Sequence, residues 1–181
     1  MEALLIALGL VAGVTVMPLV ARRTRRRHAP AAATRRILFP FVGSQLSASA
    51  LDAALRIARV EGSTLIPAYV VRVPMAMPLE APIPRACDRA FELQEAIEQR
   101  AATAGVAVDA RIGRGRDVRH ALRALLAAER YDRIVVAAAT ARTDGLSSEE
   151  VAWLLEHAPG EVVVLRPANG AALSGSSSAS G

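Results

Sequence analysis

The chain has 181 residues, 52% of them hydrophobic and only 3% aromatic, which favours one domain with an aliphatic core and short accessory segments. The formal net charge is +5, but residues 1–36 hold seven Arg and one acid, whereas residues 37–181 hold 15 Arg and 16 acids. The globular part therefore carries no basic excess, and we predict no nucleic-acid partner. The single cysteine, Cys87, excludes an intramolecular disulfide and fits a reducing compartment.

An uncharged apolar run covers residues 3–20. As a helix it would span about 27 Å, close to the hydrocarbon core of about 30 Å. Only Glu2 precedes the run and RRTRRR follows it from Arg22, the reverse of a secretory signal peptide. By the positive-inside rule we predict a single-pass cell-membrane anchor at 1–21, a basic juxtamembrane linker at 22–34 and a cytoplasmic soluble domain. A cleaved signal peptide or a buried helix is the alternative.

Apolar runs bounded by turn residues predict the elements of the soluble part. Ser47 and Asp117 are suitable helix N-caps. In the second helix Phe91, Leu93, Ala96 and Ile97 are expected to face inward. Strands are expected at 37–42, 65–71, 106–112, 131–138 and 161–165, and helices at 48–60, 85–104, from Asp117 to near Arg130, and at 149–157.

Two segments are expected to have no regular structure. Residues 73–84 contain four prolines, and the Gly/Ser/Ala tail at 168–181 is expected to be disordered. Gly113 and Gly115 are interpreted as a turn after the third strand rather than as a phosphate motif. Strands that are apolar on both faces and alternate with helices predict an α/β fold, a five-stranded parallel doubly wound sheet with helices on both faces, preceded by one transmembrane helix.

Three stretches of this sequence resemble the universal stress protein family. They are RILFPFVGSQLSASALDAALRIARVEGSTLIPAYVV from Arg36, residues 109–138 with the YDRIVV strand, and LLEHAPGEVVVLRP from Leu154. The resemblance covers the domain at 35–167. It implies a strand order of 3-2-1-4-5 and a ligand edge between strands 1 and 4. The resemblance also implies where a nucleotide would bind, because ATP-binding members of the family use an Asp at the end of strand 1 and a glycine-rich phosphate loop after strand 4.

The sequence departs from that nucleotide-binding pattern at both places. Val42 stands at the position of the strand-1 Asp, and the loop at 137–148 has one glycine and places Asp144 where it would repel a phosphate. We therefore predict no cofactor and no ATP binding. If an altered phosphate loop does bind an adenine nucleotide, the alternative function, the candidate residues are Gly43, Ser44, Arg142, Gly145, Ser147 and Ser148.

No catalytic or metal site is predicted. Ser44 lacks the G-x-S-x-G context of a nucleophile turn, and His28, His120 and His157 have no ligand partners at metal-binding spacing. We therefore expect a non-catalytic, membrane-tethered regulatory or interaction domain with an unidentified protein partner.

The last strand predicts the assembly. Val162, Val163 and Val164 lie in a strand expected at the sheet edge, where unpaired backbone groups accept another strand. The family resemblance also implies a homodimer through this strand. Val163→Pro is expected to give a monomer by removing a central donor.

Overall fold

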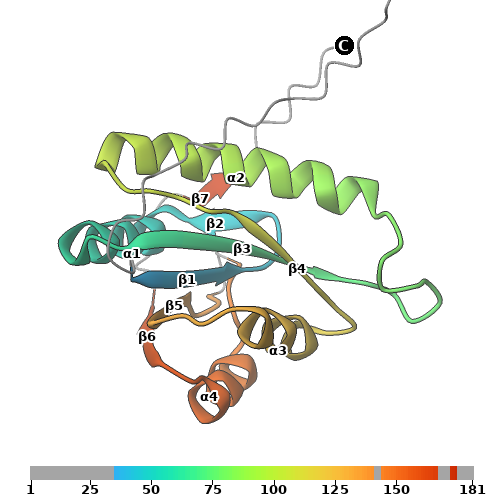
Figure 1. The fold of residues 1–181 in the computed structure, drawn as a ribbon. Helices are drawn as coiled ribbons and strands as arrows, with labels where there is room; N and C mark the ends of the chain where they lie inside the picture. Colours follow the sequence, from blue (N-terminus) through green and yellow to red (C-terminus); the bar gives the residue numbers. More distant parts are fainter. Residues whose placement is uncertain (1–34, 141–143, 167–171, 175–181) are drawn as a thin grey trace, which may run out of the picture. The chain divides into compact units, whose positions relative to one another are not determined.

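Five parallel strands form the central sheet in the order β4-β3-β1-β5-β6 (Figure 1). Numbered among themselves along the chain, these strands lie in the order 3-2-1-4-5, which confirms the predicted order. Neighbouring strands pair in parallel throughout. Their bounds are β1 Arg36–Phe41, β3 Thr64–Arg72, β4 Arg111–Gly115, β5 Arg133–Ala137 and β6 Glu161–Leu165.

The computed structural model describes residues 35–140, 144–166 and 172–174. The compact unit that contains them spans Ala32–Gly181. The anchor predicted at 1–21 and the linker predicted at 22–34 lie outside the described residues. Within the described ranges, no helix is both long and apolar enough to cross a bilayer.

Two hydrophobic layers hold the helices against the two faces of the sheet. The helices are α1 Ala48–Glu61, α2 Pro84–Ala104, α3 Val118–Ala128 and α4 Ser148–His157. Side chains alternate along β1, so that Ile37 and Phe39 pack under α1 and α2, whereas Leu38 packs under α3 and α4. Figure 1 shows these two helix pairs on opposite sides of the sheet.

The two predicted N-caps are confirmed. The Ser47 side chain accepts a hydrogen bond from the Ala50 amide at the start of α1, and the Asp117 side chain accepts one from the His120 amide at the start of α3. Each cap satisfies an amide that has no partner inside its helix.

Three sequence expectations are wrong. The third sheet strand is β4 at Arg111–Gly115, not 106–112, so Gly113 and Gly115 belong to a strand instead of a turn. Only an isolated bridge between Val108 and Leu65 remains from the earlier segment. Phe91 is 54% exposed, because the inward stripe of α2 follows Ala90, Leu93, Gln94, Ile97 and Ala101.

The third difference lies in the tail that was expected to lack structure. Residues Ala172–Ser174 form β7, which pairs antiparallel with β2 at Gln45–Ser47. Backbone pairing of this kind does not require apolar side chains, so a Gly/Ser/Ala composition does not reveal it. Residues 168–171 and 175–181 lie outside the described part of the chain.

Candidate functional site

The carboxyl ends of β1 and β5 lie next to each other, because β1 pairs with β3 on one side and with β5 on the other. This is the topological switch point, where open parallel sheets bind their ligands. β1 ends at Phe41, and the chain then turns through Val42, Gly43 and Ser44. Val42 is half-buried and packs against the hydrophobic layer under α3 and α4. An aliphatic side chain therefore stands where β1 leaves the sheet.

An internal carboxylate occupies the turn that follows β1. One oxygen of Asp144, Oδ2, accepts hydrogen bonds from the backbone amides of Ser44, at 2.7 Å, and of Gln45, at 2.9 Å. Gly43 has a φ of +80°, which directs the following amides toward one point. A Cβ at residue 43 would lie 2.2 Å from the same Asp144 oxygen, so this contact requires glycine.

The loop between β5 and α4 is fixed in place by its own backbone. The Leu146 amide donates to the Ala137 carbonyl at 2.9 Å, and the Ala139 amide donates to the Leu146 carbonyl at 2.8 Å. The Leu146 side chain is fully buried in the layer under α3 and α4. A Cβ on Gly145 would lie 2.6 Å from the Ala137 carbonyl oxygen, so glycine permits this close return of the chain. These contacts hold Asp144 beside the turn after β1.

The predicted nucleotide-binding residues have separate roles in the structure. Ser147 is the N-cap of α4 and forms a capping box with Glu150, so its hydroxyl is engaged with its own helix. Ser148 is the first residue of α4 and is exposed.

The other predicted nucleotide-binding residues lie before α4. Ser44 and Gly145 lie on the two segments that Asp144 joins, whereas Arg142 lies outside the described residues.

From the sequence, Asp144 was interpreted only as a charge that would repel a phosphate. Its bonds to Ser44 and Gln45 were missed, because they join residues about one hundred positions apart. The available signal was an acidic residue in the loop after the fourth sheet strand together with a glycine directly after the first.

Tyr69 of β3 is the register partner of Phe41, the last residue of β1. Its ring packs against Phe41, with ring centroids 5.4 Å apart, and the residue is 6% exposed. Burial raises the pKa of the Tyr69 hydroxyl, the nearby charge of Arg89 lowers this pKa, and Asp144 raises it. The Asp144 carboxylate therefore contributes to the raised pKa of Tyr69 in addition to binding the turn after β1.

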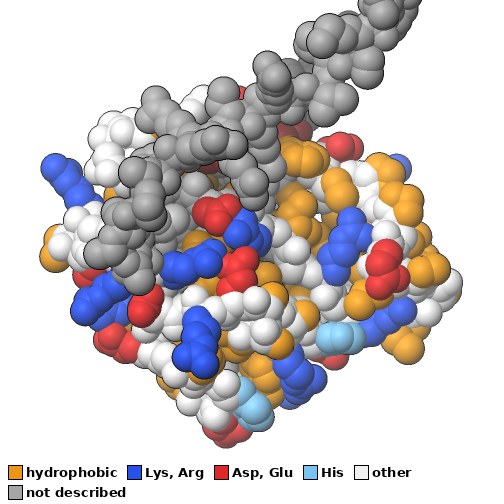
Figure 2. All heavy atoms as spheres, viewed as in Figure 1, with side chains coloured by type: hydrophobic (Ala, Val, Ile, Leu, Met, Phe, Trp, Pro, Cys, Tyr) orange, Lys and Arg blue, Asp and Glu red, His pale blue; other side chains and the backbone are white. Residues whose placement is uncertain are grey.

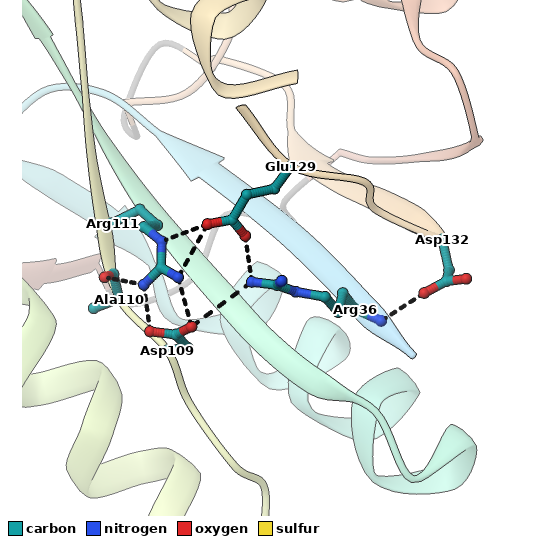
Figure 3. Close-up of polar contacts among 6 residues, drawn as sticks. All are labelled: Arg36, Asp109, Ala110, Arg111, Glu129 and Asp132. Carbon is teal, nitrogen blue, oxygen red and sulfur yellow. Dashed lines mark hydrogen bonds and ion pairs between the residues drawn. The ribbon is translucent and has the colours of Figure 1, made fainter. Parts of the chain in front are cut away.

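Charged groups at the opposite end of the sheet bind one another. Arg36 of β1 and Arg111 of β4 both form ion pairs with Asp109 and Glu129 (Figure 3). The hydrogen bond with Asp109 is the largest of the effects that raise the pKa of Arg111. The Arg36 amide donates to Asp132 at 2.7 Å. This cluster connects β1, β4 and the end of α3.

A small polar cavity of about 260 Å³ lies at the same end of the sheet, lined by Arg35, Glu61, Asp132, Arg133 and Glu161. Arg133 forms ion pairs with both Glu61 and Glu161. Across the described part of the chain, no three side chains of the metal-binding types gather into a site. On the face shown in Figure 2, basic and acidic side chains are intermixed with apolar ones.

The β6 edge of the sheet is formed by the predicted valines. Among the described strands, β6 pairs only with β5, and Val164 is 41% exposed, whereas Val162 and Val163 are half-buried. The Leu165 carbonyl accepts a hydrogen bond from the Ala138 amide, so Leu165 faces β5. Backbone groups alternate along a strand, which directs the Val163 amide toward β5 and the Val164 amide toward the free edge. The expectation that Val163→Pro removes an edge donor is therefore wrong, and Val164 is the relevant position.

Comparison with known proteins decides the family. The model of the universal stress protein family matches residues 33–166. The chain belongs to the universal stress protein family. A search of curated proteins finds no match.

Solved structures of universal stress proteins share the fold of this domain. A member from Burkholderia pseudomallei is 27% identical, with a TM-score of 0.53, and the match covers 77% of this chain and all of that one. A universal stress protein in complex with cAMP is 21% identical, with a TM-score of 0.54, over 76% of this chain and all of that one. A protein from Archaeoglobus fulgidus in complex with dAMP is 12% identical, with a TM-score of 0.55, over 74% and 98% of the two chains.

Proposed function

We propose that this universal stress protein is a non-catalytic, membrane-tethered regulatory domain that does not bind ATP and acts through protein contacts as a homodimer. The observation that carries this proposal is the Asp144 carboxylate, whose Oδ2 atom lies 2.7 Å from the Ser44 amide and 2.9 Å from the Gln45 amide. A phosphate placed at this turn would meet a fixed negative charge and two amides that already have an acceptor.

The end of β1 supports the same reading. Val42 has no hydrogen-bonding group in its side chain, at the position where the family resemblance implies an Asp in ATP-binding members. The absence of catalysis rests on the surroundings of Ser44. His120 and His157 lie on α3 and α4, and the Nδ1 atoms of both bind backbone groups of other residues. Within the described residues, neither of these histidines forms a hydrogen bond with the Ser44 hydroxyl, as a base that activates a serine would.

The second candidate is an adenine-nucleotide-binding domain with an altered phosphate loop. It is favoured by the neighbours solved with cAMP and dAMP, which share the fold of this chain. In that case the phosphate would have to bind without the Ser44 and Gln45 amides, or displace Asp144 from them.

Equilibrium dialysis of the full-length protein in a mild detergent separates the two functions. Labelled ATP and labelled dAMP are each added with Mg²⁺ at millimolar concentration, and the Archaeoglobus fulgidus protein, solved with dAMP, serves as a positive control for dAMP retention. We expect no retention by this chain, because the tethered carboxylate and the ligand compete for the same amides. Saturable retention with one nucleotide per chain would establish the second function.

The homodimer is proposed to form through β6. Its outer edge, which pairs with no other described strand, presents outward amides and the exposed Val164 side chain, and no proline lies between Glu161 and Leu165. A twofold dimer would pair two copies of this strand antiparallel and bury their valines. Tethering in one membrane would raise the effective concentration of the two copies.

A pair of variants at one position tests this assembly. Val164→Pro removes the outward amide and leaves the amides that face β5 intact, whereas Val164→Ala keeps the outward amide. For the unit Ala32–Gly181, we expect light scattering to show dimers for the wild type and Val164→Ala and monomers for Val164→Pro. A wild-type monomer at high micromolar concentration would refute the β6 dimer.

A further inference from the structure

The turn after β1 has the geometry of an anion site. Two consecutive backbone amides, from Ser44 and Gln45, converge on a single oxygen atom. The positive φ of Gly43 produces this convergence, and concave arrangements of successive amides are a common way for proteins to bind anions. The structure contains direct support for anion binding here, since an anionic group, the Asp144 carboxylate, occupies the turn.

The occupant belongs to a separate segment of the chain, and among the described residues two amide hydrogen bonds hold its carboxylate. Asp144 forms no ion pair within the described residues, so the two amide hydrogen bonds are its described polar attachments. Gln45 is exposed and Asp144 is only half-buried, so water reaches this contact. Neighbouring Leu146, by contrast, is fully buried. The Asp144 side chain is therefore the more easily detached part of an otherwise anchored loop.

We propose that the Gly43–Gln45 turn is a phosphate-binding site that Asp144 keeps filled in cis, so that the chain carries its own competitor for that site. The inference rests on the proposed function, because it gives a physical reason for the expected lack of nucleotide retention by the wild-type protein. A phosphate oxygen takes the place of the carboxylate oxygen on the same two amides. Tethering gives the carboxylate a millimolar or higher effective concentration, which external phosphate has to exceed.

Removal of the carboxylate tests the proposal in the full-length protein. Asp144→Ala empties the two amides, and Asp88→Ala removes an exposed carboxylate of α2 that makes no hydrogen bond or ion pair with the described residues. Thermal unfolding is followed with sodium phosphate, and with sodium chloride at the same ionic strength. At a tenfold excess of phosphate over its Kd, we expect the Tm of Asp144→Ala to rise by about 3–6 °C. The wild type and Asp88→Ala should show no difference between the two salts.

Amide NMR spectra locate the binding. Phosphate should shift the Ser44 and Gln45 signals of Asp144→Ala and leave those of Asp88→Ala in place. If Asp144→Ala does not fold, Asp144→Asn serves in its place, because a neutral amide oxygen is a weaker acceptor than a carboxylate and phosphate should displace it. If the Asp144 variants respond to phosphate no more than Asp88→Ala does, the proposal is overturned.

The source of the phosphate is distinguished by adding AMP and adenosine to Asp144→Ala and comparing their effects with that of orthophosphate. Stabilisation by AMP but not by adenosine supports the site, and a stronger effect of AMP than of orthophosphate assigns a nucleotide as its ligand. Equal effects of AMP and orthophosphate support a site for phosphate groups in general. Retention of ATP by the wild type would refute the proposed function, whereas failure of Asp144→Ala to gain a phosphate response refutes only this inference.

Discussion

Leu146→Ala tests whether the loop between β5 and α4 is anchored firmly enough to hold Asp144 in place. The Leu146 side chain is fully buried under α3 and α4. The substitution removes three carbons at about 0.8 kcal/mol each, so loss of transfer free energy alone costs about 2.4 kcal/mol. Hydrogen bonds to Ala137 and Ala139 limit collapse of the backbone into the space left behind. With the cavity included, we expect the free energy of unfolding to fall by about 3–4 kcal/mol.

Leu155 provides a matched control for this substitution. It lies on the adjacent helix α4 and is 57% exposed, so Leu155→Ala should change the free energy of unfolding by less than about 0.5 kcal/mol. Urea unfolding of the unit Ala32–Gly181, followed by circular dichroism, measures both variants, with an unchanged m-value showing that the comparison is valid. A loss below about 1 kcal/mol for Leu146→Ala would refute the anchored loop.

Three further predictions follow from the same structure. Burial and Asp144 raise the pKa of the Tyr69 hydroxyl, Arg89 lowers it, and the net shift is upward. A raised pKa in the folded state means that Tyr69 stabilises the folded protein fully below about pH 10, and that this contribution is lost as the pH rises through the folded-state pKa. Urea midpoints above pH 10 should therefore fall less for Tyr69→Phe than for the wild type, and an equal fall in both would contradict this reasoning. Gly43→Ala should lower the free energy of unfolding by about 1–3 kcal/mol, because its Cβ would overlap Asp144 at a positive φ, and an unchanged urea midpoint would contradict the contact. A reporter fused after Gly181 should be active only in the cytoplasm, and activity on the opposite side of the membrane would reverse the predicted topology.

Local sequence patterns predicted most elements, because apolar runs, caps and helix-ending glycines depend on nearby residues, whereas the strand order came from the family resemblance. The failures concern contacts that cross the fold. Phe91 lies one position after the buried Ala90, which is about 100° around the helix axis. An error of one position in the predicted inward face therefore assigned the exposed Phe91 ring to the core. Gln94 was overlooked because it is polar, yet it is buried and donates to the Arg111 carbonyl of the edge strand.

The position of β4 illustrates a second limit. Gly113 and Gly115 disfavour a strand by local propensity, but the close packing of α3 requires small residues there. A Cβ on Gly115 would lie 2.4 Å from the Ala121 amide nitrogen, and one on Gly113 would lie 2.7 Å from a Leu125 methyl carbon. Such a requirement follows from tertiary contacts and leaves no periodic pattern in the sequence.

The candidate site was predicted in part. The resemblance located the ligand edge and the departures at Val42 and Asp144, which the structure places near the ends of β1 and β5. The role of Asp144 as the occupant of the turn depends on the backbone directions of Ser44 and Gln45, and these are set by the φ of Gly43. A one-dimensional pattern does not specify those directions.

Asp144 occupies the two amides, of Ser44 and Gln45, that we propose a phosphate would use. The most direct measurement is a titration of the full-length wild-type protein with MgATP in a mild detergent, followed through the amide signals of Ser44 and Gln45. Both signals should keep their positions through millimolar ATP, because the two amides already have an acceptor. Saturable shifts of these two signals would show that ATP displaces Asp144 from the two amides and would refute its role as their occupant.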